Sequence, residues 1–171
     1  VQNNNMVPIV EPEVLMDGSH SIEDCYSATS RSLERLFNCL TDYEVNINGT
    51  ILKPNMVTSG STASEQAKIS LVAEKTLKCL QNSLPDDLPA VTFLSGGQSD
   101  IGSTAHLDKM NKISSNPWKL SFSYGRALQQ AALKAWSGNV ENETAAQEAF
   151  SHRAKMNKLA ALGEWEGSLE N

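Results

Sequence analysis

The sequence predicts an α/β protein with a parallel sheet, and two observations carry this prediction. Short apolar segments alternate with longer segments of helical periodicity, as they do in proteins whose strands run parallel. The strand candidates are also nearly all apolar, which is typical of strands buried on both faces. They cover residues 7–11, 50–53, 91–94 and 118–123. An eight-unit β/α barrel needs about 250 residues, so the 171 residues of this chain hold about half of one.

A helical segment is expected after each strand candidate, and an extra helix at the end. These helices are expected over residues 21–40, 64–81, 100–113, 125–136 and 142–162. Ser21 can cap the first helix, with Asp24 completing a capping box. Ser64 is the expected cap of the second, whose apolar residues recur at helical spacing. We expect residues 1–163 to form one half-barrel unit and residues 164–171 to fray.

Composition and charge exclude several classes of function. The net charge is −6 and the isoelectric point is about 5.0, so the chain is a poor non-specific ligand for nucleic acid. It lacks an apolar run of about 18 or more residues, so no membrane span is expected. The start of the chain does not resemble a secretion signal, and three cysteines, an odd number, fit reduced thiols. We therefore expect a cytoplasmic protein without nucleic-acid or membrane partners.

A lysine ends the second strand candidate. Lys53 shares one face of the strand with Ile51, and Pro54 stops the strand directly after it. If that face points to the centre of a barrel, the amine loses hydration and its pKa falls. The neutral amine can then attack a ketone and form a Schiff base. A lysine at a strand end is more often a solvated charge, so the residues alone leave both interpretations open.

Two carboxylates end the first strand candidate. Glu11 and Glu13 flank Pro12, and in extended geometry both side chains point the same way. Two close carboxylates cannot both ionise freely, so one can hold a proton near neutral pH. This arrangement suits acid–base steps beside a lysine. The string Glu-Pro-Glu is also common in exposed turns, which is the alternative interpretation.

Anion-binding features follow the third and fourth strand candidates. The loop Ser95-Gly96-Gly97 lets backbone N–H groups approach an anion without an intervening Cβ atom. Gly125-Arg126 begins a helix, and both the helix N-terminus and the guanidinium group favour phosphate. Each feature alone is ordinary for a loop or a protein surface. Together, and at the ends of neighbouring strands, they indicate a phosphate site.

Four sequence strings, in this order, resemble class I fructose-bisphosphate aldolase. They are VPIVEPE (residues 7–13), ILKPNMVT (51–58), FLSGGQS (93–99) and SFSYGRALQ (121–129), followed by LKAW (133–136). The resemblance extends from Val1 to about Leu162. It corresponds to strands five to eight of the family's (β/α)8 TIM barrel, plus a C-terminal helix. The family's first four strands, whose aspartate and lysines serve catalysis and phosphate binding, have no counterpart here, and neither has its terminal tyrosine.

The resemblance implies an enzyme of glycolysis that needs no metal or other cofactor. Such a lyase cleaves fructose 1,6-bisphosphate reversibly, through a Schiff base, into dihydroxyacetone phosphate and glyceraldehyde 3-phosphate. By the resemblance, Lys53 forms the Schiff base, Glu11 accepts protons and Glu13 assists. The residues implied in binding substrate and phosphate are Ser95, Gly96, Gly97, Ser123, Gly125 and Arg126. The expected partners are a phosphorylated ketose, and either further copies of the chain, since the family is usually tetrameric, or a complementary N-terminal half.

Two other functions remain open at this stage. A truncated aldolase homologue could serve as a non-catalytic binding or scaffold protein, and this half chain could be inactive alone. An enzyme of another Schiff-base barrel family is a weaker alternative. The histidines His20, His106 and His152 lack the spacing of metal ligands, so no metal site is expected.

Overall fold

The computed structural model describes residues 1–113 and 115–171 and contains a four-stranded parallel sheet. Its strands are β1 (Ile9–Val10), β2 (Ile51–Leu52), β3 (Ala90–Phe93) and β4 (Lys119–Phe122). Their order across the sheet is their order along the chain. The predicted α/β fold with about four β/α units is confirmed.

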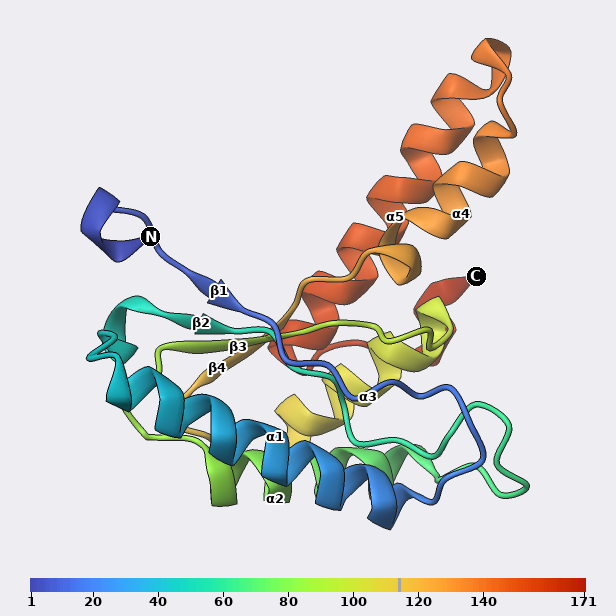
Figure 1. Ribbon diagram of the computed structural model, residues 1–171. Helices are drawn as coiled ribbons and strands as arrows, with labels where there is room; N and C mark the ends of the chain where they lie inside the picture. The colour runs from blue at the N-terminus through green and yellow to red at the C-terminus, as the bar shows by residue number, and fades with distance from the viewer. Residues whose placement is uncertain (114) are drawn as a thin grey trace.

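The helices connect these strands and extend beyond the last one. They are α1 (Ile22–Asp42), α2 (Ile69–Ser83), α3 (Asp100–Ile113), α4 (Arg126–Trp136) and α5 (Glu143–Leu162), with short 3-10 helices η1 (Gln2–Asn4), η2 (Ile47–Gly49), η3 (Val140–Asn142) and η4 (Gly167–Glu170). In Figure 1, α1 and α2 lie together below the sheet, and α4 and α5 form a hairpin that projects from the body. Among the described residues, no helix is both long and apolar enough to span a bilayer.

The two faces of the sheet have different surroundings. Leu52, Val91 and Leu120 lie side by side in the register and are at most 5% exposed, because they pack against the helices. The side chains before and after them point to the opposite face. That face is open: Ile9 on it is 55% exposed, and Lys119 is exposed as well. Since parallel sheets normally have both faces covered, the structure is half of a barrel whose inner face is uncovered.

The helix boundaries show where local sequence signals decide the structure. The predicted capping box of α1 is confirmed: the Ser21 hydroxyl accepts from the Asp24 N–H, and the Asp24 carboxylate accepts from the Ser21 N–H. The predicted start of the second helix at Ser64 is wrong, because α2 begins at Ile69. Residues 60–67 form a loop instead, in which the Gln66 amide donates to two carbonyl groups of the loop itself.

The C-terminal residues are held against the body. The Trp165 N–H donates to Asp108 on α3 at 3.0 Å, and the Trp165 indole donates to Glu170 at 2.9 Å. Glu170 also forms an ion pair with the buried Arg153 of α5. These contacts hold Trp165 and Glu170 against α3 and α5, at a chain end where fraying is expected from the sequence.

Candidate active site

An amine and a carboxylate meet at the carboxyl ends of two adjacent strands. Lys53 Nζ lies 2.9 Å from Glu11 Oε1. The register pairs Ile9 with Ile51, and Glu11 and Lys53, directly after β1 and β2, are the next positions that face inward. The Lys53 side chain is 20% exposed and that of Glu11 is 49% exposed. The amine is thus within direct proton-transfer distance of a carboxylate, on the open inner face.

Two hydroxyl groups continue the same row across the sheet. By the register, Thr92 follows Lys53 and Ser121 follows Thr92, on the same face. Both are half-buried, and the Thr92 hydroxyl donates to the Leu52 carbonyl at 3.5 Å. These two residues are not predictable from the sequence, because a single Thr or Ser within an apolar strand carries no signal without the register.

The segment after β1 is anchored by a buried amide. The Val14 N–H donates to Asn55 Oδ1 at 2.9 Å, and Asn55 Nδ2 donates to the Thr29 hydroxyl of α1 at 3.0 Å. This fixes the chain directly after Glu13, which is itself exposed. Asn55 is therefore a positioning residue that is not predictable from the sequence, since nothing in its string distinguishes it from a loop residue.

The glycine-rich loop after β3 lies beside the arginine that begins α4. Gly97 has φ +87°, a conformation that favours glycine. A Cβ atom there would lie 3.5 Å from Arg126 Nη2 and 3.4 Å from Met16 Sδ. Gly96 also has positive φ, at +56°, and Ser95 before it is buried. The structure thus brings the loop and Arg126 together, with Met16 as a third member.

The segment of Ser123, Gly125 and Arg126 is positioned by a tyrosine. Tyr124 is buried and its hydroxyl donates to the Ser103 carbonyl on α3 at 2.9 Å. Burial raises the pKa of the Tyr124 hydroxyl above its ordinary range, so it stays a donor. The Ser123 N–H donates to the Phe93 carbonyl at 2.9 Å, which keeps the carboxyl ends of β3 and β4 level.

A histidine ties the glycine-rich loop to α3. His106 Nδ1 and Gln98 Oε1 are 2.6 Å apart. Burial lowers the pKa of His106 to about 4, so the imidazole is neutral near pH 7 and its Nδ1–H can donate to Gln98. The pairing joins residues eight positions apart, one in the loop and one on α3, and no local sequence pattern predicts it. In the part of the chain that the structure describes, no three His, Cys, Asp or Glu side chains are grouped to hold a metal ion.

The fold and the site together define a class of protein: half of a β/α barrel with an amine-centred site at the carboxyl ends of its strands. The family model for fructose-bisphosphate aldolase class-I matches residues 1–171. A probable fructose-bisphosphate aldolase class 1 from Xanthomonas axonopodis pv. citri is 53% identical over 97% of this chain and 50% of its own length. The cytosolic fructose-bisphosphate aldolase 4 of Arabidopsis thaliana is 49% identical over 99% of this chain and 43% of its own length.

A solved structure agrees with these sequence relatives. Fructose-bisphosphate aldolase from Plasmodium falciparum, in complex with TRAP and a small molecule inhibitor, superposes with a TM-score of 0.94 at 43% identity. The match covers 97% of this chain and 48% of that one. The chain belongs to the class I fructose-bisphosphate aldolase family, and it spans about half the length of the curated relatives it matches.

Proposed function

We propose that this chain carries the covalent half of an aldolase site. There, fructose 1,6-bisphosphate is cleaved reversibly to dihydroxyacetone phosphate and glyceraldehyde 3-phosphate. The observation that carries the proposal is the distance of 2.9 Å between Lys53 Nζ and Glu11 Oε1 on the inner face of the half barrel. Family membership supports the substrate, since the relatives are named fructose-bisphosphate aldolases.

The first step is the formation of a Schiff base on Lys53. The ammonium group must lose a proton before it can attack, and Glu11 is placed to accept that proton. The neutral amine then adds to the C2 ketone of the open-chain sugar. The carbinolamine loses water as Glu11 returns its proton to the departing hydroxyl, so an iminium ion remains and Glu11 is again a carboxylate. Glu13, two residues beyond Glu11, is the assisting carboxyl group in this proposal.

The second step breaks the bond between C3 and C4. Glu11 removes the proton of the C4 hydroxyl, and the electrons of the C3–C4 bond move into the iminium ion, which becomes an enamine. Glyceraldehyde 3-phosphate departs as the C4 carbonyl forms. Protonation of the enamine and hydrolysis then release dihydroxyacetone phosphate and return the free amine of Lys53.

The phosphate is held by the groups after β3 and β4. The Gly96-Gly97 loop exposes backbone N–H groups, and Arg126 adds a guanidinium group beside it. We assign Ser95, directly before the loop, and Ser123, directly after β4, to the same phosphate site, and a Cβ atom on Gly125 before α4 would meet nothing within 4 Å. These residues would orient the ketose with its C2 carbonyl toward Lys53.

The test is reductive trapping of the Schiff base. The 171-residue chain is incubated with fructose 1,6-bisphosphate and sodium borohydride, and peptide mass mapping locates the reduced adduct. Lys75 is an internal control, because it also pairs with a glutamate, Glu23, at 2.6 Å, and is similarly exposed, at 25%. We expect the adduct on Lys53 and none on Lys75. Equal labelling of the two lysines, or none on Lys53, contradicts the proposal.

Product analysis separates binding from turnover. Release of glyceraldehyde 3-phosphate by the chain alone would mean that this half suffices for cleavage. An adduct on Lys53 without release would keep the covalent role and reject turnover by this half chain, as in the non-catalytic alternative. We further propose that the working form is a homo-oligomer or a complex with a complementary half, in the cytoplasm, as the relatives named cytosolic suggest.

A further inference from the structure

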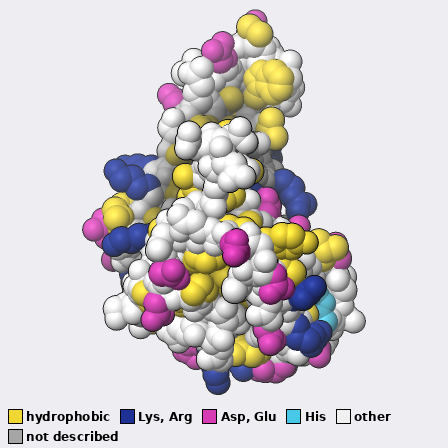
Figure 2. Space-filling view, turned by 60° about the vertical axis from the view of Figure 1, so that its left-hand side comes forward, with side chains coloured by type: hydrophobic (Ala, Val, Ile, Leu, Met, Phe, Trp, Pro, Cys, Tyr) yellow, Lys and Arg dark blue, Asp and Glu magenta, His cyan; other side chains and the backbone are white. Residues whose placement is uncertain are grey.

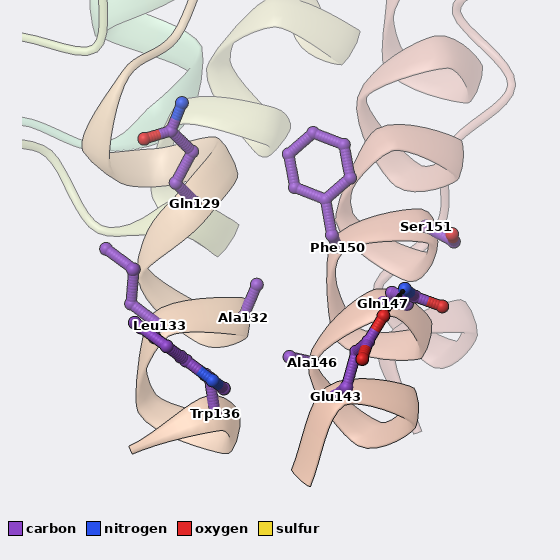
Figure 3. Close-up of a pocket in the computed structure, with 9 residues that line it drawn as sticks. All are labelled: Gln129, Ala132, Leu133, Trp136, Glu143, Ala146, Gln147, Phe150 and Ser151. Carbon is purple, nitrogen blue, oxygen red and sulfur yellow. Dashed lines mark hydrogen bonds between the residues drawn. The ribbon is translucent and has the colours of Figure 1, made fainter. Parts of the chain in front are cut away.

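The hairpin of α4 and α5 is anchored to the body through the second half of α5. Figure 2 shows the hairpin projecting from the body, and Phe150 of α5 lines the groove between the two helices (Figure 3). The buried residues of α5 come later in the helix: they are Arg153, Met156, Asn157 and Ala160. Arg153 is thus the first buried side chain where α5 meets the body, and it is the charged member of this set, with 3% exposure.

The guanidinium group of Arg153 contacts the first turn of α3. Its Nη2 donates to the Thr104 hydroxyl at 2.6 Å and to the Asp100 carbonyl at 3.3 Å. Asp100 is the first residue of α3, and Thr104 is fully buried. A charge withdrawn from water needs such partners, because removing one of them leaves the penalty of burial uncompensated. These bonds therefore hold the first turn of α3 against α5.

The same guanidinium group is also paired with the segment after α5. Its Nη1 forms the ion pair with Glu170, whose side chain is 10% exposed and also accepts from the Trp165 indole. Nε of Arg153 has no partner among the described residues, so the two terminal nitrogens make the contacts, one with Glu170 and the other with α3. A planar, forked cation can serve both partners at once, whereas a lysine ammonium is a single point charge.

The first turn of α3 supports the glycine-rich loop. The loop leads directly into this turn, and the Ser99 hydroxyl accepts from the Gly102 N–H at 3.0 Å. The Gln98 N–H donates to the Ser95 carbonyl at 3.0 Å, which closes the loop around Gly96-Gly97. A displacement of the first turn of α3 is therefore passed to the backbone N–H groups that we assign to the phosphate.

The amine and the carboxylate of the candidate site are held by other contacts. Glu11 and Lys53 directly follow β1 and β2, and the Lys53 N–H donates to the Val10 carbonyl at 2.8 Å. The bonds of Arg153 go instead to α3 and to Glu170. Loss of Arg153 should therefore disturb phosphate binding and leave the chemistry of Lys53 in place.

We propose that Arg153 is a positioning residue for the glycine-rich loop, and that its ion pair with Glu170 sets the affinity of this loop for the phosphate group of the ketose. The inference rests on the proposed function in one respect, because it takes the glycine-rich loop as part of the phosphate site. It adds a means of regulation: any change that draws Glu170 away from Arg153 weakens phosphate binding, although neither residue touches the phosphate.

Two ketones that differ by one phosphate group separate the loop from the amine. Borohydride trapping on Lys53 is measured with dihydroxyacetone phosphate and with dihydroxyacetone, and each gives a concentration for half-maximal trapping. In Arg153→Met that concentration should rise ~10-fold for the phosphorylated ketone and stay within ~2-fold for dihydroxyacetone, because one charge-assisted contact that orients the loop is lost. Equal changes for both ketones, or no change for the phosphorylated one, overturn the proposal.

Milder variants keep the test decisive if Arg153→Met does not fold. Glu170→Gln removes only the charge of the partner, and Arg153→Lys keeps the cation without its fork. Each should show part of the ~10-fold effect, again for the phosphorylated ketone alone. The matched control is Glu166→Gln, which removes an exposed carboxylate of the same segment and should change neither value. An effect of Glu166→Gln as large as that of Glu170→Gln would overturn the proposal.

Direct phosphate binding tests the inference without the covalent step. The amide resonances of Gly96 and Gly97 are followed by NMR as inorganic phosphate is added. We expect both to shift, and Arg153→Met to bind phosphate ~10-fold more weakly than the native chain or Glu166→Gln. If neither resonance shifts in the native chain, the proposal is overturned whatever happens at Lys53. Phosphate-dependent shifts without an adduct on Lys53 would instead contradict the proposed function and support the role of the loop.

Discussion

A single methyl group at Gly60 tests how the loops around the candidate site are joined. A Cβ atom on Gly60 would overlap the Gly18 carbonyl oxygen and lie 2.9 Å from the His20 backbone nitrogen. These are backbone atoms and cannot move aside as a flexible side chain would. In Gly60→Ala the segment after β2 must therefore separate from the segment after β1.

The expected cost follows from the bonds that this separation breaks. Three backbone N–H groups, of Gly60, Ser61 and Thr62, donate to carbonyl groups of residues 16–20, at 2.9, 2.6 and 3.0 Å. At ~0.5–1.5 kcal/mol for each net hydrogen bond, the free energy of unfolding should fall by about 2–4 kcal/mol. For a chain of this size that corresponds to a melting temperature lower by about 10 °C.

Urea and thermal unfolding measure this change against a matched control. Gly167→Ala also adds one methyl group, but there the Cβ atom would meet only the Trp165 ring, at an ordinary 3.8 Å. We expect that control to stay within about 1 kcal/mol of the native chain. If Gly60→Ala unfolds within about 0.5 kcal/mol of the native free energy, the two loops do not depend on this contact and the reasoning is wrong.

Three further predictions concern other parts of the molecule. Because the folded chain keeps His106 neutral with a pKa of about 4, whereas its ordinary value is 6.5, only the unfolded chain binds a proton there between these values. The free energy of unfolding, measured by urea titration, should therefore fall as the pH drops from 6.5 to about 4. In His106→Gln this contribution to the pH dependence should be missing. Parallel pH profiles of the two proteins would contradict the prediction. Glu11→Gln should slow the formation of the trapped adduct by ~10²-fold or more, whereas Glu23→Gln should not, as timed borohydride quenching would show. Thr76→Val removes the acceptor of the buried Val57 N–H, now at 2.9 Å, and should lower the free energy of unfolding by about 1–3 kcal/mol; an unchanged urea midpoint would mean that this N–H finds another partner.

The sequence predicted the order and type of the main elements because their signals are local. The capping box at Ser21 and the apolar spacing of each helix depend on residues a few positions apart, and the structure agrees with them. The start of α2 was mispredicted for a physical reason. Ser64 looks like a cap, but the Ser59 hydroxyl accepts from the Ala67 N–H and holds that stretch in a loop.

The residues of the candidate site could be selected from the sequence, whereas the residues that hold them in place could not. Lys53 and Glu11 were selected from strand ends and from the family resemblance, and the structure brings them to 2.9 Å. The assignment of their roles stays a prediction. Asn55, His106 and Met16 were not selected, because each acts through a partner distant in the chain, and only the folded structure shows which groups they contact.

The agreement between sheet order and chain order has a consequence for synthesis of the protein. Each strand's neighbour is also the next strand along the sequence, so every pairing closes a loop of only one helix and its turns. No pairing therefore waits for an element beyond the next strand, and a chain emerging from the ribosome can add the strands one after another. The amine and carboxylate can therefore come together once residues 1–53 have emerged, before the glycine-rich loop or the arginine has been translated.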